Sequence, residues 1–187
     1  MSININVSEA SLLEMLSDKG RQHEAFEILV RQYSRPLYCI IRRIVLVHND
    51  ADDILQNTFM KAWRALPMFQ GKSKISSWLY RIAVNEALVF IREKKKMEFC
   101  EVDEKTDIAA RLMADEYFDG NEAEALLQEA VALLPEVQRV VFQLKYYEEM
   151  KYSEMREILG TSEGALKASY HIAVKKVQEY IKSRSKD

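Results

Sequence analysis

The sequence predicts an all-α fold: two small helical domains joined by an acidic flexible linker, the second domain with a helix-turn-helix. Apolar residues recur at helical spacing along most of the chain, and no segment shows the strict alternation of a half-buried strand. The 187 residues include only five glycines and three prolines. That composition is typical of a protein with long helices and few tight turns. We therefore expect helices and no sheet.

The first domain is predicted to span residues 1–96. Its expected helices run from about Glu9 to Ser17, Glu24 to Val47, Ala51 to Leu66 and Ser76 to Lys95. Pro36 is expected to kink the second helix, and Pro67 to close the third.

The fourth of these helices carries a basic edge. At about 100° per residue, four polar residues fall on one narrow stripe beside a broad apolar arc: Lys74, Arg81, Asn85 and Arg92. We expect most of this helix to be covered by protein and this edge to remain exposed.

A linker is predicted at residues 97–121 and a second domain at residues 122–187. Within the linker only a short turn around Ala109 to Ala114 is expected. The helices expected in the second domain run from Glu122 to Leu134, Glu136 to Glu148, Glu154 to Leu159 and Glu163 to Ser183. Their predicted boundary residues are Pro135 at a first helical position, Ser153 and Ser162 as N-caps, and Gly160 as a left-handed C-cap.

Charge is strongly segregated along the chain, although the net charge is only −2. Residues 61–96 contain nine lysines and arginines against two glutamates, a net charge of +7, and residues 164–186 carry +5. Between them, residues 97–122 carry −7. Two basic blocks around an acidic connector suit a protein that contacts a polyanion at two places. Clustering of ordinary solvated helix faces is the alternative.

The last two helices have helix-turn-helix proportions, with a short helix, the turn Gly160-Thr161-Ser162 and a longer helix. One face of the longer helix is apolar, and the opposite face carries Gly164, Lys167, Ala168, His171, Lys175 and Gln178. Recognition in the major groove needs cations for phosphates and small or hydrogen-bonding side chains for base edges. This face offers both, although helical hairpins also occur in plain bundles.

The helix from Asn49 to Leu66 is predicted to bind a protein. Its polar face includes an outward-facing methionine, Met60, among amide and charged groups. Methionine at a surface suits a protein partner, and the acidic start of this helix would repel phosphate. An ordinary solvated face is the alternative. The loop that follows, Phe69 to Trp78, combines cations, hydroxyls and aromatics that could hold an unstacked base.

The sequence gives little support for an enzyme, a metal-binding protein or a membrane protein. Phosphate-binding, zinc-protease and nucleophile-elbow motifs are missing from the sequence. Cys39 and Cys100 are far apart and lack the spacing of metal ligands, so we expect free thiols, no cofactor and no metal. Because catalytic motifs are missing, we expect that the protein is not an enzyme. No apolar run is long enough to cross a membrane, so we expect a cytoplasmic protein that does not insert into a membrane.

Four segments of the chain resemble the extracytoplasmic function (ECF) group of bacterial RNA polymerase sigma factors. They are HEAFEILVRQYSRPLY, DADDILQNTFMKAW, SSWLYRIAVNEAL and the long segment from ALPEVQRVV to HIAVKK. The resemblance covers about residues 22–96 and 122–184, in the order of sigma regions 2 and 4. It implies a promoter-specificity subunit that directs RNA polymerase to promoters and assists promoter opening.

The resemblance also implies partners and roles. The β′ clamp helices of core polymerase would bind Asp50, Asp53, Gln56, Asn57, Met60 and Arg64, and the β flap would be a further polymerase contact. The minus-ten element of promoter DNA would contact Lys72, Lys74, Ser77, Arg81, Asn85, Arg92, Lys94, Lys95 and Lys96. The minus-thirty-five element would contact Ser162, Gly164, Lys167, Ala168, His171, Lys175 and Lys176. An anti-sigma factor is the implied inhibitor.

Two other functions stay open at this point. A free-standing helix-turn-helix regulator would bind a duplex tightly without polymerase. A recombinase or nuclease would cleave DNA, but the sequence shows no constellation of carboxylates or of serine and arginine for that chemistry.

Overall fold

The structure is a computed structural model that describes residues 7–69, 71, 73–98, 108–115 and 120–184. Within these ranges every regular element is a helix, which confirms the all-α prediction. The first half contains α1 (Glu9–Ser17), α2 (Gln22–Val45), α3 (His48–Ala65), the short η1 (Leu66–Met68) and α4 (Ile75–Glu98). The second contains α5 (Ile108–Met113), α6 (Glu122–Ala132), α7 (Glu136–Phe142), η2 (Gln143–Tyr147), α8 (Tyr152–Leu159) and α9 (Glu163–Arg184).

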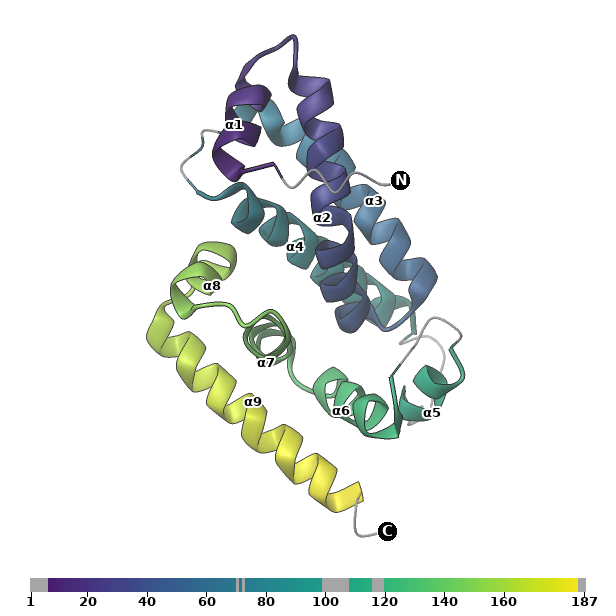
Figure 1. Cartoon of the computed structure of the whole chain (residues 1–187). Coiled ribbons are helices and arrows are strands. Elements are labelled where there is room, and N and C mark those ends of the chain that lie inside the picture. The colour runs from purple at the N-terminus through teal and green to yellow at the C-terminus, as the bar shows by residue number, and fades with distance from the viewer. Residues whose placement is uncertain (1–6, 70, 72, 99–107, 116–119, 185–187) are drawn as a thin grey trace.

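The helices α1 to α4 form an N-terminal bundle in which α2, α3 and α4 all pack against one another (Figure 1). α2 continues as one helix through Pro36, where the sequence predicts a kink. The Glu9 carboxylate at the start of α1 accepts a hydrogen bond from the backbone amide of Ile75. This bond satisfies one of the amides that the first turn of a helix leaves unpaired, so α1 fixes where α4 begins.

The C-terminal half is built from α6, α7, α8 and α9, with α9 packed along the other three. Asn121 and Glu124 form a capping box at the start of α6. α7 begins at Glu136 as predicted but ends at Phe142, and the π-helical η2 continues to Tyr147 where the sequence predicts one helix as far as Glu148. α8 begins two residues earlier than predicted, a difference that is common at helix ends. Pro135 is the N-cap of α7 instead of its first residue, and α8 begins after Lys151, so Ser153 is not its N-cap.

The two predictions for the turn between α8 and α9 are confirmed. Gly160 adopts the left-handed conformation, with φ of 64°. The Ser162 hydroxyl accepts a hydrogen bond from the backbone amide of Ala165.

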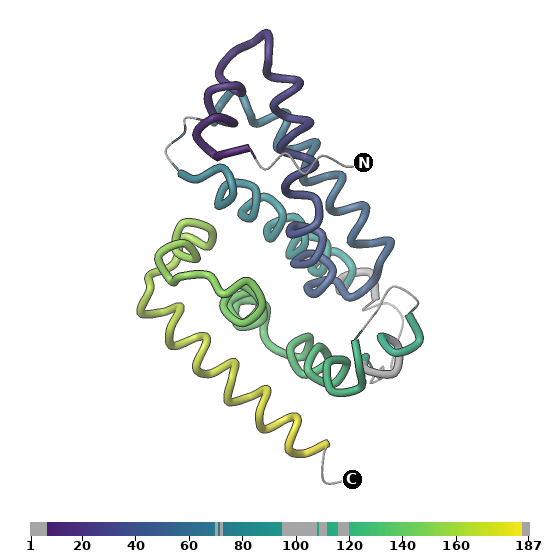
Figure 2. Tube along the Cα trace, viewed as in Figure 1, coloured from purple at the N-terminus to yellow at the C-terminus, as the bar shows by residue number. Residues whose placement is uncertain are grey.

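The two halves pack against each other. α4 lies between the α2–α3 pair and the C-terminal half, where it contacts α8, while α2 contacts η2 (Figure 2). One buried apolar cluster includes residues of every helix from α1 to α4 and also Val140, Val141, Leu144, Met155, Ile158 and Leu166 of the second half. A smaller cluster between α6, α7 and α9 belongs to the C-terminal half alone. The helical units are thus joined by a shared core.

Most of the predicted linker lies outside the described residues. Its described part contains α5, near the predicted turn at Ala109 to Ala114, and Asp115, whose carboxylate pairs with Arg42 of α2. Of the two cysteines, Cys39 is a half-buried free thiol, and Cys100 is outside the described ranges. None of the described helices combines the length and hydropathy needed to cross a membrane.

Candidate nucleic-acid and polymerase interfaces

The exposed face of α9 presents the residues that the sequence predicts for the minus-thirty-five element. Leu166, Ala173 and Val177 bury the opposite face. The predicted contact residues are exposed: Ser162, Gly164, Lys167, Ala168, His171, Lys175 and Lys176. The α8–α9 turn therefore delivers a solvent-facing helix with small residues and cations at its N-terminal end.

The cations of this face are held only by weak contacts. The Lys167 ammonium lies 5.6 Å from the ring centroid of Tyr152. Lys175 and Glu179 are 3.9 Å apart and both exposed, an arrangement worth about 0.3–0.5 kcal/mol on a helix. The Lys176 ammonium donates to the side-chain oxygen of Gln138 at 3.0 Å. Phosphate groups could displace such contacts at little cost.

The predicted basic edge of α4 is in a different situation, because it faces the C-terminal half, although Lys74, Asn85 and Arg92 remain exposed. The Lys74 ammonium lies 3.1 Å from a Glu154 carboxylate oxygen of α8. Arg92 lies 2.7 Å from the Glu136 carboxylate of α7. The hydrogen bond to Glu154 raises the pKa of Lys74 and lowers that of Glu154. Two cations predicted to contact DNA are therefore paired with acidic groups of the same chain.

A cleft of about 380 Å³ separates α4 from α7 and α8. Arg81, Asn85 and Arg92 line one wall, and Glu136 and Glu157 are among the residues of the other. The buried Nε of Arg81 has no hydrogen-bond partner among the described groups.

The remaining residues predicted for the minus-ten element are scattered. Ser77 is only 5% exposed, so its hydroxyl lies inside the bundle. Lys94 pairs with Asp50 at 2.9 Å, which joins one predicted DNA contact to one predicted polymerase contact. Lys72 lies outside the described residues, and Lys95 and Lys96 belong to α4 with side chains that are not described.

The predicted docking face of α3 is open to solvent. Asp53, Gln56, Asn57, Met60 and Arg64 are all exposed, and Asp50 is half-buried. Nothing from the described C-terminal helices is among the main packing partners of α3, which contacts α2, α4 and η1.

Sequence reasoning missed an apolar hollow beside this face. Helical periodicity puts Trp63 on the apolar stripe of α3, but Trp63 is 40% exposed. The Trp63 ring packs edge-on against Phe26 at a centroid distance of 4.9 Å and near His23 at 6.0 Å. Together with residues of α2 these rings line a hollow of about 270 Å³. The signal in the sequence was a tryptophan three residues after the outward-facing Met60.

Sequence reasoning also missed a polar cluster between the halves, centred on Glu148. One carboxylate oxygen of Glu148 lies 2.8 Å from the Arg43 guanidinium of α2, and the other accepts from the Tyr80 hydroxyl of α4 at 3.0 Å. The Arg43 guanidinium also lies 4.3 Å from the ring centroid of Tyr147. Burial, and next the Glu148 charge, raise the pKa of Tyr80, so Tyr80 remains a hydrogen-bond donor.

Residues 29–97 match the family model for sigma-70 region 2, and residues 124–177 match that for sigma-70 region 4. The ECF RNA polymerase sigma factor SigW of Bacillus subtilis is 30% identical over 162 residues, covering 82% of this chain and 86% of that protein. The chain belongs to the ECF group of sigma factors. As a sigma factor, it directs RNA polymerase to specific promoters in transcription initiation.

Other comparisons agree with this membership. The ECF RNA polymerase sigma-E factor of Haemophilus influenzae is 26% identical over 171 residues, covering 87% of this chain and 89% of that protein. A structure of CnrH with the cytosolic domain of CnrY has a TM-score of 0.70 at 23% identity and covers 94% of this chain and 97% of that one. The sigma factor RpoE of Bartonella quintana, solved with the anti-sigma factor NepR, has a TM-score of 0.69 at 22% identity, with coverages of 84% and 96%. These two likenesses concern the fold.

Proposed function

We propose that this sigma factor divides its work among three helices. The face of α3 around Met60 binds the clamp helices of the β′ subunit. The basic edge of α4 reads and helps to open the minus-ten element. The exposed face of α9 enters the major groove of the minus-thirty-five element, with Lys167 on a phosphate or a base edge. The domain boundaries predicted from sequence, 1–96 and 122–187, define the units that carry these contacts.

The observation that carries this proposal is the solvent-exposed face of α9. It follows a helix-turn-helix connection within the region 4 match, and it combines cations with the small residues Gly164 and Ala168. Small side chains let a helix approach base edges closely, while cations bind the flanking phosphates.

The wider setting of the protein is part of the same proposal. The factor acts in the cytoplasm with core polymerase, contacts the β flap through its C-terminal half, and has no catalytic activity of its own. Because the sigma factor RpoE, which has the same fold, was solved with the anti-sigma factor NepR, we include an anti-sigma partner for this chain.

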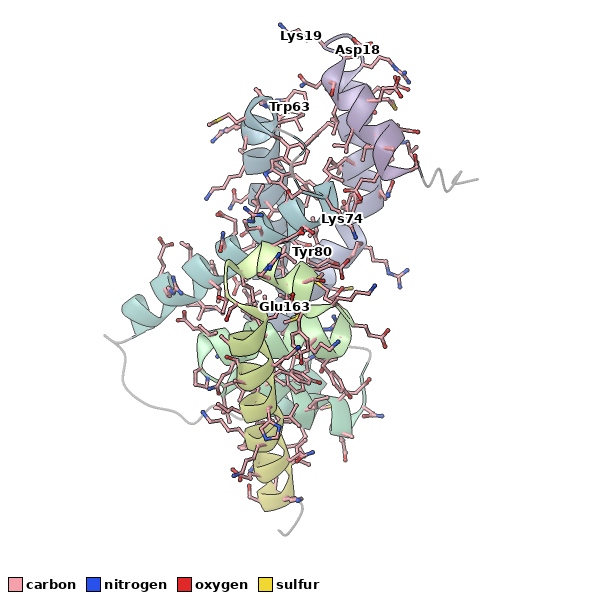
Figure 3. All side chains as sticks on the ribbon, turned by 90° about the vertical axis from the view of Figure 1, so that its left-hand side faces the viewer. Asp18, Lys19, Trp63, Lys74, Tyr80 and Glu163 are labelled. Atoms are coloured by element: carbon pink, nitrogen blue, oxygen red, sulfur yellow. The ribbon has the colours of Figure 1, made fainter. Side chains whose placement is uncertain are left out.

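The test is transcription in vitro with core polymerase over a promoter library. Lys167→Glu should greatly reduce transcription from the selected promoters, and neutral Lys167→Gln should lower the salt dependence of promoter binding by about one counterion. Lys19→Glu is the matched control. Lys19 is an exposed residue in the α1–α2 connection, far from the start of α9 at Glu163 (Figure 3). Equal promoter-directed transcription by the wild type and Lys167→Glu would refute the α9 assignment.

A gel-shift experiment separates this proposal from a free-standing regulator. The chain alone should bind a selected promoter duplex weakly, and core polymerase should confer tight binding. Tight sequence-specific binding without polymerase would favour the free-standing helix-turn-helix regulator instead.

A further inference from the structure

Glu9 lies where the first turns of two helices meet. It is the first residue of α1, and its carboxylate accepts a hydrogen bond from the backbone amide of Ile75, the first residue of α4. Figure 1 shows the beginning of α1 beside the beginning of α4. Because the N-terminal end of a helix carries a partial positive charge, both helices favour a carboxylate at this place.

The position of the Glu9 carboxylate is fixed because α1 is itself firmly held. The Ser8 hydroxyl accepts a hydrogen bond at 3.2 Å from the backbone amide three residues further on, which caps the helix. Leu12 is fully buried, and Met15 and Leu16 are at most 8% exposed, in one core with α2, α3 and α4. Moving Glu9 away from α4 would therefore draw these side chains out of the core.

The first turn of α4 depends on this carboxylate. Every helix start leaves backbone amides without partners inside the helix, and Glu9 supplies an acceptor for the amide of Ile75. The bond that closes the turn runs from the Trp78 amide to the Lys74 carbonyl at 3.0 Å. The side chains of Ile75 and Leu79 are fully buried, so they keep α4 attached to the bundle. Without the Glu9 acceptor, the first turn should fray while the rest of the helix stays in place.

The same turn positions an aromatic pair at the proposed minus-ten contact. The rings of Trp78 and Phe69 have centroids 4.8 Å apart and planes inclined by 37°, and both side chains are half-buried. The Phe69 amide bonds to the Leu66 carbonyl at 3.0 Å, so Phe69 is held from the α3 side. Trp78 reaches it from the first turn of α4. Aromatic rings can stack on an unpaired base, and the geometry of this pair depends on where α4 begins.

We propose that Glu9 is a positioning residue for opening the minus-ten element. Its carboxylate fixes the first turn of α4 through the Ile75 amide, and this turn places Trp78 against Phe69. A surface that is in place before the duplex opens loses less conformational freedom when it captures an unstacked base. This inference rests on the proposed minus-ten role of α4.

The experiment measures promoter opening by holoenzyme assembled from core polymerase and the full chain. A 2-aminopurine base in the minus-ten element of a selected promoter reports unstacking through its fluorescence. Glu9→Ala removes the acceptor and should slow opening by about tenfold, the effect of losing a hydrogen bond to a charged group. Glu9→Gln keeps a side-chain oxygen as a neutral acceptor and should stay within about threefold of the wild-type rate.

Two further measurements distinguish positioning from a general loss of structure. The affinity of Glu9→Ala for core polymerase should equal that of the wild type, because Glu9 belongs to α1 and the docking face to α3. On a template whose minus-ten element is already unpaired by mismatches, Glu9→Ala should recover most of its transcription, since unpairing no longer limits the rate. Glu14→Ala removes a carboxylate from the exposed side of the same helix and should match the wild type throughout.

The outcomes separate this inference from the proposed function. Opening at the wild-type rate by Glu9→Ala overturns the inference, and so does an equal loss of transcription on paired and unpaired templates. Arg81→Glu, with its affinity for core polymerase unchanged, tests the minus-ten role of α4 itself. Wild-type opening by Arg81→Glu would remove that role, and the Glu9 inference with it. Slow opening by Arg81→Glu alone would leave the proposed function standing and refute only the role of Glu9.

Discussion

Lys74 at the start of α4 and Glu154 in the first turn of α8 form an ion pair of 3.1 Å that joins the two halves of the chain. The same Glu154 carboxylate accepts a hydrogen bond from the backbone amide of Lys151. One side chain thus both caps α8 and binds the helix proposed to read the minus-ten element. Protonation of Glu154 should therefore weaken both the cap of α8 and the contact between the two halves.

This arrangement predicts an acid-dependent stability. The hydrogen bonds from Lys74 and from the Lys151 amide hold the pKa of Glu154 below 4.5, its ordinary value. The stabilisation is therefore fully present above about pH 4.5 and is lost as the pH falls through the lowered pKa. Glu154→Gln should lower Tm at about pH 7 and change it much less at about pH 3. Glu14→Gln, on the exposed face of α1, should alter Tm little at either pH, and a Glu154→Gln effect of equal size at both would contradict the prediction.

Because the two halves share a core, a destabilising substitution in the C-terminal half should also shift the unfolding transition of the N-terminal half. Both tryptophans, Trp63 and Trp78, belong to the N-terminal half, whereas Leu144 lies in η2 and is fully buried. Leu144→Ala should reduce the free energy of unfolding by about 2–5 kcal/mol, and tryptophan fluorescence in a urea titration should report the loss. Leu133→Ala is the control, because Leu133 is 58% exposed. A tryptophan transition unmoved by Leu144→Ala would mean that the halves unfold independently.

Local sequence patterns predicted the helices well. They did not predict the contacts between helices. The left-handed C-cap at Gly160 depends on neighbouring residues only, so it could be read from the sequence. Glu86 falls within the apolar arc of α4, which helical periodicity alone does not explain. The structure pairs its carboxylate with Lys61 of α3 at 2.6 Å, a partner 25 positions away.

The same contrast holds for the candidate site, where the α9 face was easier to predict than the α4 edge. The face of α9 is defined by one helix, and its predicted residues are exposed as a group. The edge of α4 was predicted to be open to solvent, and Lys74 and Arg92 are exposed. The sequence did not predict that both would pair with carboxylates of the C-terminal half, Glu154 and Glu136. Periodicity identifies which residues share a face but not which other element covers it.

The hollow beside Met60 predicts an additional contribution to polymerase binding. Trp63 and Phe26 present apolar ring surface directly next to the proposed docking face, and a half-exposed tryptophan in a hollow is a common interface anchor. Trp63→Ala should weaken binding of the chain to core polymerase by at least about tenfold, measured by anisotropy of labelled protein. Met68→Ala removes an apolar side chain that is 81% exposed and should leave the affinity unchanged. Circular dichroism should first establish that both variants are folded. Equal affinities of the wild type and Trp63→Ala for core polymerase would exclude the hollow from the interface.

Alanine substitutions at two glycines near the helix-turn-helix connection should change the stability of the protein in opposite directions. Gly160 has φ of 64°, and an added Cβ would meet nothing within 4 Å. Gly160→Ala should therefore lose about 1–2 kcal/mol through backbone strain alone. Gly164 also faces open space and, as the second residue of α9, has no positive φ, so Gly164→Ala should gain stability, by no more than the roughly 0.5–1 kcal/mol of a mid-helix position. Urea denaturation of the two variants and the wild type checks both signs, and a Gly160→Ala chain as stable as the wild type would show that the turn tolerates another backbone conformation.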